Sequence, residues 1–178
     1  GTTYYVRKKA DDSQNASAWA LIKVNERPGK PDESLFTMKQ ETVQNKKDGS
    51  LDGITNVMEY RVTTNPEGTE WTEWKVGTGE ILKGLSSEKV EVRLKATETA
   101  PCGEKRTFTF EASSEKLKVK FGDNVVEYAY NSLLSEPEVP AVPEGYEFLG
   151  WACKGKKWNF ATDKVTESIT LEPIWGLN

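Results

Sequence analysis

The chain has 178 residues, with 24 Lys and Arg against 28 Asp and Glu, a net charge of −4, and no histidine. A nucleic-acid-binding protein normally presents a basic face, so the acidic balance argues against that class. The lack of histidine excludes Ser-His-Asp and Cys-His catalysis and every zinc site that contains histidine. No apolar run approaches the ~20 residues that a membrane-spanning helix needs.

Apolar and polar residues alternate with a period of two along most of the chain, which predicts β-strands. Runs of this kind occupy residues 4–7, 21–24, 35–38, 59–63, 74–76, 90–94, 107–110, 117–121 and 125–130. Turn signals that contain Gly and Pro separate the runs, for example Lys47-Asp48-Gly49 and Pro143-Glu144-Gly145. No segment has a sustained helical period with capping residues. The sequence therefore predicts an all-β fold with at most one short helix.

An internal repeat relates the first residues of the chain to its middle. Val6-Arg7-Lys8-Lys9-Ala10 is similar to Val92-Arg93-Leu94-Lys95-Ala96, which lies 86 residues later, and a strand-like run follows each copy. This period fits a β-sandwich module of ~100 residues. We therefore predict that residues 1–27 are tail strands of an upstream repeat module and that residues 28–113 form a complete module. Lone strands leave backbone groups unpaired, so we expect the edge of residues 1–27 to pair with a partner chain.

A small polar stretch at residues 112–115 predicts a second boundary, and we expect proteases to cut there first. Beyond it, Gly145-Tyr146-Glu147-Phe148-Leu149-Gly150-Trp151 has the form G-Y-x-F-x-G-W, and Trp158-Asn159-Phe160 and Ile169-Thr170-Leu171 follow. Over residues 115–176 this pattern resembles the Listeria–Bacteroides repeat, the B-repeat module of internalin-type surface proteins. The resemblance implies a small β-grasp-like fold for residues 114–178 and a secreted or wall-attached bacterial protein.

The aromatic residues of this segment are interpreted as its core, because a module of this size needs concentrated apolar burial. Exposed aromatic residues that form a ligand platform are the alternative. The expected core residues are Tyr146, Phe148, Trp151, Trp158, Phe160, Leu171 and Trp175.

The strand-turn-strand patterns at residues 51–62 and 81–93 resemble fibronectin-type-III-like and bacterial immunoglobulin-like modules, which implies a β-sandwich for residues 28–113. Within it, Trp71 and Trp74 would face opposite sides of a continuous strand. We expect Trp74 in the core and Trp71 on the outer face. There Trp71 could stack on a sugar ring or anchor a protein partner, or simply cap the sandwich edge.

Residues able to perform other chemistry are few. The acidic loops at residues 11–12 and 48–52 lack the spacing of a calcium loop, so their carboxylates are interpreted as solvated. Cys102 and Cys153 are too few for a disulfide scaffold and are expected to be free thiols in separate modules. Two thiolates alone also cannot complete a zinc site. The basic turn Lys154-Gly155-Lys156-Lys157 is interpreted as a charged strand edge, with contact to an anionic wall polymer as the alternative.

The sequence predicts no catalytic residue, metal site or cofactor. The predicted function is that of non-catalytic spacer or presentation modules in an extracellular bacterial protein, secreted or attached to the cell wall. Two alternatives stay open, namely an adhesin or carbohydrate-binding module that uses Trp71, and an accessory region of a secreted hydrolase. The expected partners are upstream and downstream modules of the same protein and an unidentified host or wall glycan or protein. Neither nucleic acid nor a transmembrane segment is expected.

Overall fold

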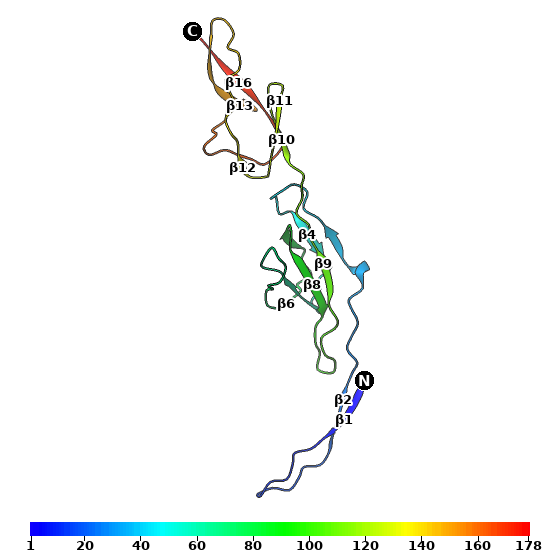
Figure 1. Cartoon of the computed structure of the whole chain (residues 1–178). Helices are drawn as coiled ribbons and strands as arrows, with labels where there is room; N and C mark the ends of the chain where they lie inside the picture. The colour runs from blue at the N-terminus through cyan, green and yellow to red at the C-terminus, as the bar shows by residue number, and fades with distance from the viewer. The chain divides into compact units, whose positions relative to one another are not determined.

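The computed structural model describes all residues from 1 to 178, and its secondary structure consists of β-strands apart from one short turn of 3₁₀ helix (Figure 1). This confirms the all-β fold that the alternating pattern predicted. The 3₁₀ turn η1 (Glu33–Leu35) takes the place of the start of the strand expected at residues 35–38. It is capped by Asp32, whose Oδ1 accepts a hydrogen bond from the backbone N–H of Ser34 at 2.9 Å.

The chain divides into two compact units. The first contains Gly1–Met38, Leu51–Leu82 and Ser87–Phe110, and the second contains Lys39–Ser50, Lys83–Ser86 and Glu111–Asn178. A three-stranded sheet of order β3-β4-β7 is made of β3 (Thr37–Lys39), β4 (Gly49–Asp52) and β7 (Leu82–Leu85). The units do not coincide with the ranges 28–113 and 114–178, which stay a prediction about folding modules.

The first unit contains an antiparallel sheet of order β6-β5-β8-β9, formed by β5 (Met58–Val62), β6 (Lys75–Val76), β8 (Lys89–Leu94) and β9 (Arg106–Thr109). Strand β8 lies in the middle, so that Val92 is opposite both Tyr60 and Arg106. Val90 and Val92 are fully buried, and the ring of Phe108 packs against Phe36 with 4.9 Å between centroids. Val90 and Val92 are the apolar positions whose period of two predicted β8, and Glu91 between them is also buried.

Residues 26–32, a linker that contains Pro28 and Pro31 and leads into η1, are packed against the segment that precedes β9. The carbonyl of Pro28 accepts a hydrogen bond from the N–H of Glu104 at 2.9 Å, and the carbonyl of Pro31 accepts one from Nε of Arg106 at 2.6 Å. These bonds fix the linker in addition to the stiffness that its prolines confer.

The first 27 residues form a separate hairpin of β1 (Thr2–Val6) and β2 (Ala20–Val24). The strands pair from Thr2 opposite Val24 to Val6 opposite Ala20, and all ten strand residues are exposed. The hairpin therefore buries no apolar side chain of its own strands.

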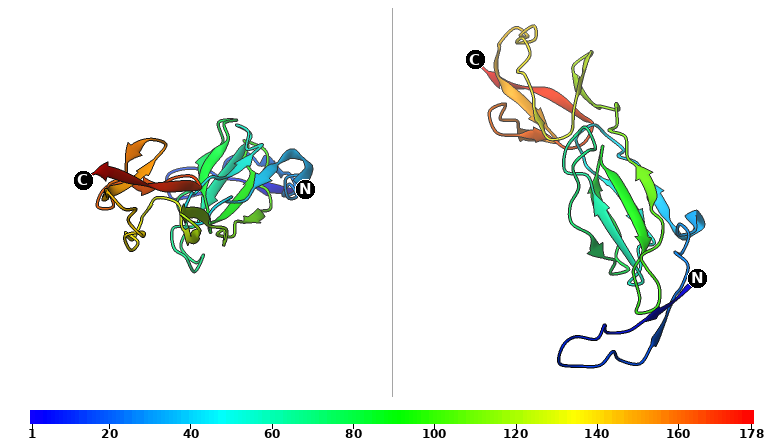
Figure 2. Two further views of the ribbon diagram at one scale, coloured as in Figure 1. Left: turned by 90° about the horizontal axis from the view of Figure 1, so that it is seen from above. Right: turned by 60° about the horizontal axis from the view of Figure 1, so that its bottom comes forward.

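The second unit contains a five-stranded sheet of order β11-β10-β16-β13-β14. Its strands are β10 (Leu117–Phe121), β11 (Asn124–Tyr128), β13 (Tyr146–Cys153), β14 (Lys156–Lys157) and β16 (Ile169–Leu177). Strands β10 and β16 are parallel and the other pairs are antiparallel; the long strands β13 and β16, orange and red in Figure 2, run side by side. A short pair, β12 (Ser132–Leu133) with β15 (Lys164–Val165), contributes Val165 to the core.

Gly150 and Pro173 lie where the pairing of this sheet is irregular or ends. The register between β13 and β16 shifts between Phe148 and Gly150, and Gly150 has a φ of 130°. A side chain at Gly150 would also meet Lys157, so glycine is required there. The ladder between β16 and β10 ends at Leu171, so Pro173 pairs with β13 alone and needs no N–H on its other side.

The segment before β4 carries a carboxylate that makes stability depend on pH. Burial alone would raise the pKa of Asp48, but hydrogen bonds from Oγ1 and N of Thr42, at 2.6 and 2.8 Å, and the ammonium of Lys46, at 3.1 Å, outweigh it and lower the pKa to about 2. A carboxyl whose pKa falls on folding stabilises the native state above its unfolded pKa, here 3.8. We expect this contribution to be present above pH 4 and lost as the pH falls toward about 2.

The measurement is urea unfolding of the protein and of Asp48→Asn between pH 2 and 7. The asparagine variant should be less stable than the wild type at pH 6, and the difference should narrow as the pH falls toward 2. A difference that stays constant over this range would show that the charge of Asp48 does not contribute.

Candidate functional site

Four side chains form a continuous stack on the sheet of the first unit. The guanidinium of Arg61, on β5, lies 4.6 Å from the ring centroid of Trp71 and 4.8 Å from that of Trp74. The guanidinium of Arg93, on β8, also lies over the ring of Trp74, at 3.8 Å from its centroid. Since a guanidinium is attracted to the face of an indole ring, the stack ties two strands to the segment that precedes β6.

Ion pairs surround this stack. Arg61 binds Glu91 with 2.6 Å between Nη2 and Oε2, Lys105 reaches the same carboxylate at 2.9 Å, and Arg93 pairs with Glu59. Burial would raise the pKa of Glu91, but the hydrogen bonds and charges of Lys105 and Arg61 lower it below its usual value. Both arginines are thus held by carboxylates as well as by the indole rings.

Trp71 and Trp74 do not face opposite sides, contrary to the prediction from the sequence. Both rings contact Arg61, and Trp74 is half-buried between guanidinium groups rather than inserted in the apolar core. The alternation argument assumed one continuous strand, whereas Trp71 forms an isolated bridge with Thr63 and β6 begins only at Lys75. A ligand-binding role of Trp71 stays a prediction.

The second unit gathers most of the predicted aromatic residues around one core. Trp151 is 3% exposed and meets the rings of Phe121 and Phe148 edge-on, at 5.5 and 5.7 Å between centroids. Trp175 contacts Phe148 in turn at 5.8 Å. Leu171 is fully buried, and Trp158 and Phe160 pack against the cluster while partly exposed.

Tyr146 does not belong to this core, contrary to expectation. Its side chain is 41% exposed because it stands at the first residue of β13, opposite Leu177 at the end of β16. The sheet ends there, and Leu177 itself is exposed.

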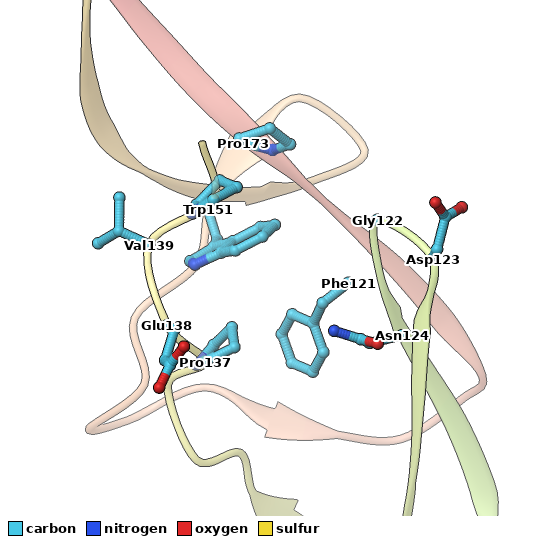
Figure 3. A pocket seen from close by; sticks show the side chains of 10 residues that line it. Phe121, Gly122, Asp123, Asn124, Pro137, Glu138, Val139, Trp151 and Pro173 are labelled. Atoms are coloured by element: carbon cyan, nitrogen blue, oxygen red, sulfur yellow. The ribbon is translucent and has the colours of Figure 1, made fainter. Parts of the chain in front are cut away.

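A hollow of about 560 Å³ is lined in part by two rings of the aromatic core, Phe121 and Trp151 (Figure 3). Phe121 and Trp151 line it between the turn at Gly122–Asn124 and the segment that includes Pro137 and Val139. The buried Nε1 of Trp151 has no hydrogen-bond acceptor. The hollow therefore offers aromatic and apolar contact beside the polar side chains of Asp123, Asn124 and Glu138. The indole N–H is buried and is not exposed to it.

A second hollow, of about 380 Å³, collects positive charge at the turn between β13 and β14. Lys156, Lys157 and Lys164 line it together with one acidic residue, Asp163. Lys154 also lines it while pairing with Glu167 at 2.6 Å. This contact raises the pKa of Lys154, through the hydrogen bond first and the charge of Glu167 second. The basic turn of the sequence thus joins a lysine from β15, which sequence spacing alone did not indicate.

The acidic loops and the cysteines have simpler roles. Oδ1 of Asp11 accepts hydrogen bonds from the backbone of Ser13 and Gln14, both at 2.9 Å, and so closes a turn. Hydrogen bonds from Ser13 account for most of the lowering of the Asp11 pKa. Cys102 and Cys153 are free thiols, each partly exposed.

Glu41 is a buried polar residue that the sequence analysis missed. Its carboxylate accepts hydrogen bonds from Oγ of Ser86 at 2.9 Å, from the N–H of Lys47 at 2.7 Å and from the N–H of Ser113 at 2.9 Å. The stretch around residue 113 is further fixed because the carbonyl of Glu115 accepts a bond from Gln44 at 2.8 Å. These bonds argue against this stretch as the first site of proteolysis.

Comparison with known proteins supports the C-terminal resemblance. Residues 107–172 match the Listeria-Bacteroides repeat domain, beginning a few residues before the range expected from the motif. The chain is 39% identical over 56 residues to a protein of Evansella cellulosilytica named "Putative membrane protein", which covers 30% of this chain and 8% of that protein. It is 28% identical over 109 residues to a second protein of that bacterium, named "Putative Gly-rich membrane protein", covering 56% of this chain and 12% of the relative. The chain thus corresponds to a small part of each relative.

The chain therefore contains, at residues 107–172, a segment similar to a repeat domain that is typical of bacterial surface proteins. No helix in it has the length and apolar character required to cross a membrane.

Proposed function

We propose that the chain consists of non-catalytic repeat modules of an extracellular bacterial protein, secreted or attached to the cell wall, which act as spacers or present other parts of that protein. The match of residues 107–172 to the Listeria-Bacteroides repeat domain carries this proposal. The small aromatic core supports it, since the bulky side chains of the repeat serve packing rather than a catalytic cleft. In this proposal residues 28–113 form a fibronectin-type-III-like or immunoglobulin-like module, and residues 114–178 form a β-grasp-like one.

The test is surface labelling of the bacterium that carries the gene. An antibody raised against this chain should label intact cells or be captured from the culture medium, and mild protease treatment of intact cells should remove the cell-bound signal. An antibody against a cytoplasmic protein is the control and should label permeabilised cells only. Labelling that requires permeabilisation, with no protein in the medium, would contradict the proposal.

The lysine-lined hollow favours an adhesin as the second candidate function. Lys156, Lys157 and Lys164 form no ion pair with a carboxylate, and a polyanion such as a wall polymer could neutralise them. We expect the chain to bind heparin, used as a polyanion probe, with an affinity that falls steeply with salt and drops about tenfold in the triple alanine variant. The aromatic site is tested separately on a glycan array, where Trp71→Ala, if its fold is unchanged, should lose any glycan binding that depends on this residue. Binding that survives both changes would remove both sites from consideration.

A further inference from the structure

The N-terminal hairpin reproduces the last hairpin of the middle module in its strand register. Thr3 pairs with Lys23 and Val6 with Ala20. At 86 residues further along the chain, Lys89 pairs with Thr109 and Val92 with Arg106. The intervening pairs agree in the same way, so β1 and β2 have the register of β8 and β9.

The loops of the two hairpins also correspond bond by bond. The N–H of Asp11 donates to the carbonyl of Gln14 at 3.0 Å, and the N–H of Thr97 donates to the carbonyl of Ala100 at 2.9 Å. The side chain at the first position then accepts a bond from the N–H at the last, through Oδ1 of Asp11 at 2.9 Å and Oγ1 of Thr97 at 3.1 Å.

A third bond closes each loop at its base. The N–H of Ser17 donates to the carbonyl of Lys8 at 3.2 Å, and the N–H of Gly103 donates to the carbonyl of Leu94 at 2.9 Å. The repeat seen in the sequence is thus a repeat of backbone structure.

The two hairpins differ in what covers them. Val90, Val92, Phe108 and Phe110 are at most 8% exposed, whereas their counterparts Tyr4, Val6, Ile22 and Val24 are between 39% and 53% exposed. In the middle module, β5 pairs with the edge of β8 that β9 leaves open. Leu51 and Met58 are buried in the same module. In the first hairpin the corresponding apolar face is exposed, and β1 pairs with β2 alone, so that its other edge has no neighbouring strand.

We infer that the face of Tyr4, Val6, Ile22 and Val24 and the free edge of β1 bind a strand equivalent to β5, supplied by another copy of the module placed before Gly1 on the same polypeptide. Charge supports this occupant. Glu59 of β5 lies opposite Arg93 and forms an ion pair with it, and the counterpart of Arg93 is Arg7. A β5-type strand would therefore place a carboxylate beside Arg7.

The base of the hairpin is already joined to the middle module in a way that suits serial modules. Arg27 donates from Nε to the carbonyl of Cys102 at 3.1 Å and from Nη2 to the carbonyl of Gly103 at 3.2 Å. Asn25 donates its N–H to the carbonyl of Thr99 at 3.2 Å. This inference concerns how modules are completed and does not depend on where the protein resides.

The test is an extended chain in which residues 28–86 are added directly before Gly1, which restores the spacing between a β5-type strand and β1. We expect backbone amides of Thr2–Val6 to exchange hydrogen about 100-fold more slowly in the extended chain than in the original one. A reference chain carries residues 28–113 twice in tandem and shows whether the added segment can fold at such a junction.

Two variants of the extended chain distinguish the inner from the outer face. Val6→Glu places a charge on the face to be covered and should abolish the added protection. Tyr5→Glu places the same charge at the counterpart of Glu91, which pairs with Arg61 in the middle module, and should preserve the protection.

The inference is supported if exchange is slow in the extended chain and in its Tyr5→Glu variant but fast in its Val6→Glu variant. Unchanged exchange, while the tandem reference folds, would overturn it. Protection of the hairpin in the original chain that rises with protein concentration would also overturn it, because a partner molecule would then cover this face.

Discussion

Replacement of Trp151 by alanine should unfold the part of the second unit that contains the five-stranded sheet. The indole is almost fully buried and contacts the rings of Phe121 and Phe148, so its loss removes apolar contacts from both neighbours and leaves a cavity. Truncation of a buried aromatic residue costs about 3–5 kcal/mol, a large part of the stability of a domain of this size. The free energy of unfolding can be measured by urea titration, with hydrogen exchange of the backbone amides of residues 117–177 as the probe of unfolding.

Two variants accompany this test. Tyr146→Ala removes another aromatic residue from the same strand, but at an exposed position, and should change the free energy of unfolding by about 0.5 kcal/mol or less. Trp151→Phe keeps one ring in the cluster but loses the second ring of the indole, together with an N–H that has no acceptor, so its cost should lie between the two. Equal costs for Trp151→Ala and Tyr146→Ala would show that the burial of Trp151 does not determine stability.

Glu41→Ala should destabilise the second unit by about 2–4 kcal/mol, because three buried or partly buried donors lose their acceptor at once. It should also release the stretch around Ser113, whose N–H binds that carboxylate. Limited proteolysis should therefore cut residues 111–116 much faster in the variant than in the wild type. Urea unfolding supplies the free energy.

Glu115→Ala is the control, since its side chain is exposed and the bond from Gln44 uses its backbone carbonyl. This variant should be cut at the wild-type rate. If Glu41→Ala were also cut at that rate, the carboxylate would not be what holds the stretch.

Alternation predicted most strands of this chain because the strands that form the cores expose one face and bury the other. Leu117–Phe121 is the clearest example, with three buried residues alternating with two exposed lysines. The same rule failed for Trp74 because the chain between Trp71 and Lys75 is not a strand. A pattern along the chain carries information on side-chain direction only where the backbone is regular.

The charged contacts were beyond prediction for a different reason. Glu41 binds groups that lie 6, 45 and 72 residues away in the sequence, and Arg61 meets Glu91 at a distance of 30 residues. Such partners are brought together only by the tertiary fold. The aromatic motif of the C-terminal segment succeeded because its residues pack mainly on one another.

The parallel pairing of β10 with β16 determines how the five-stranded sheet of the second unit responds to mechanical pulling. These are the first and last of its strands along the chain, and they run in the same direction through Val119 opposite Ile169 and Phe121 opposite Leu171. Tension applied to the chain on either side of the sheet acts along both strands in opposite senses. The inter-strand hydrogen bonds are then loaded together in shear instead of being opened one after another, a geometry that resists extension along the direction of the chain.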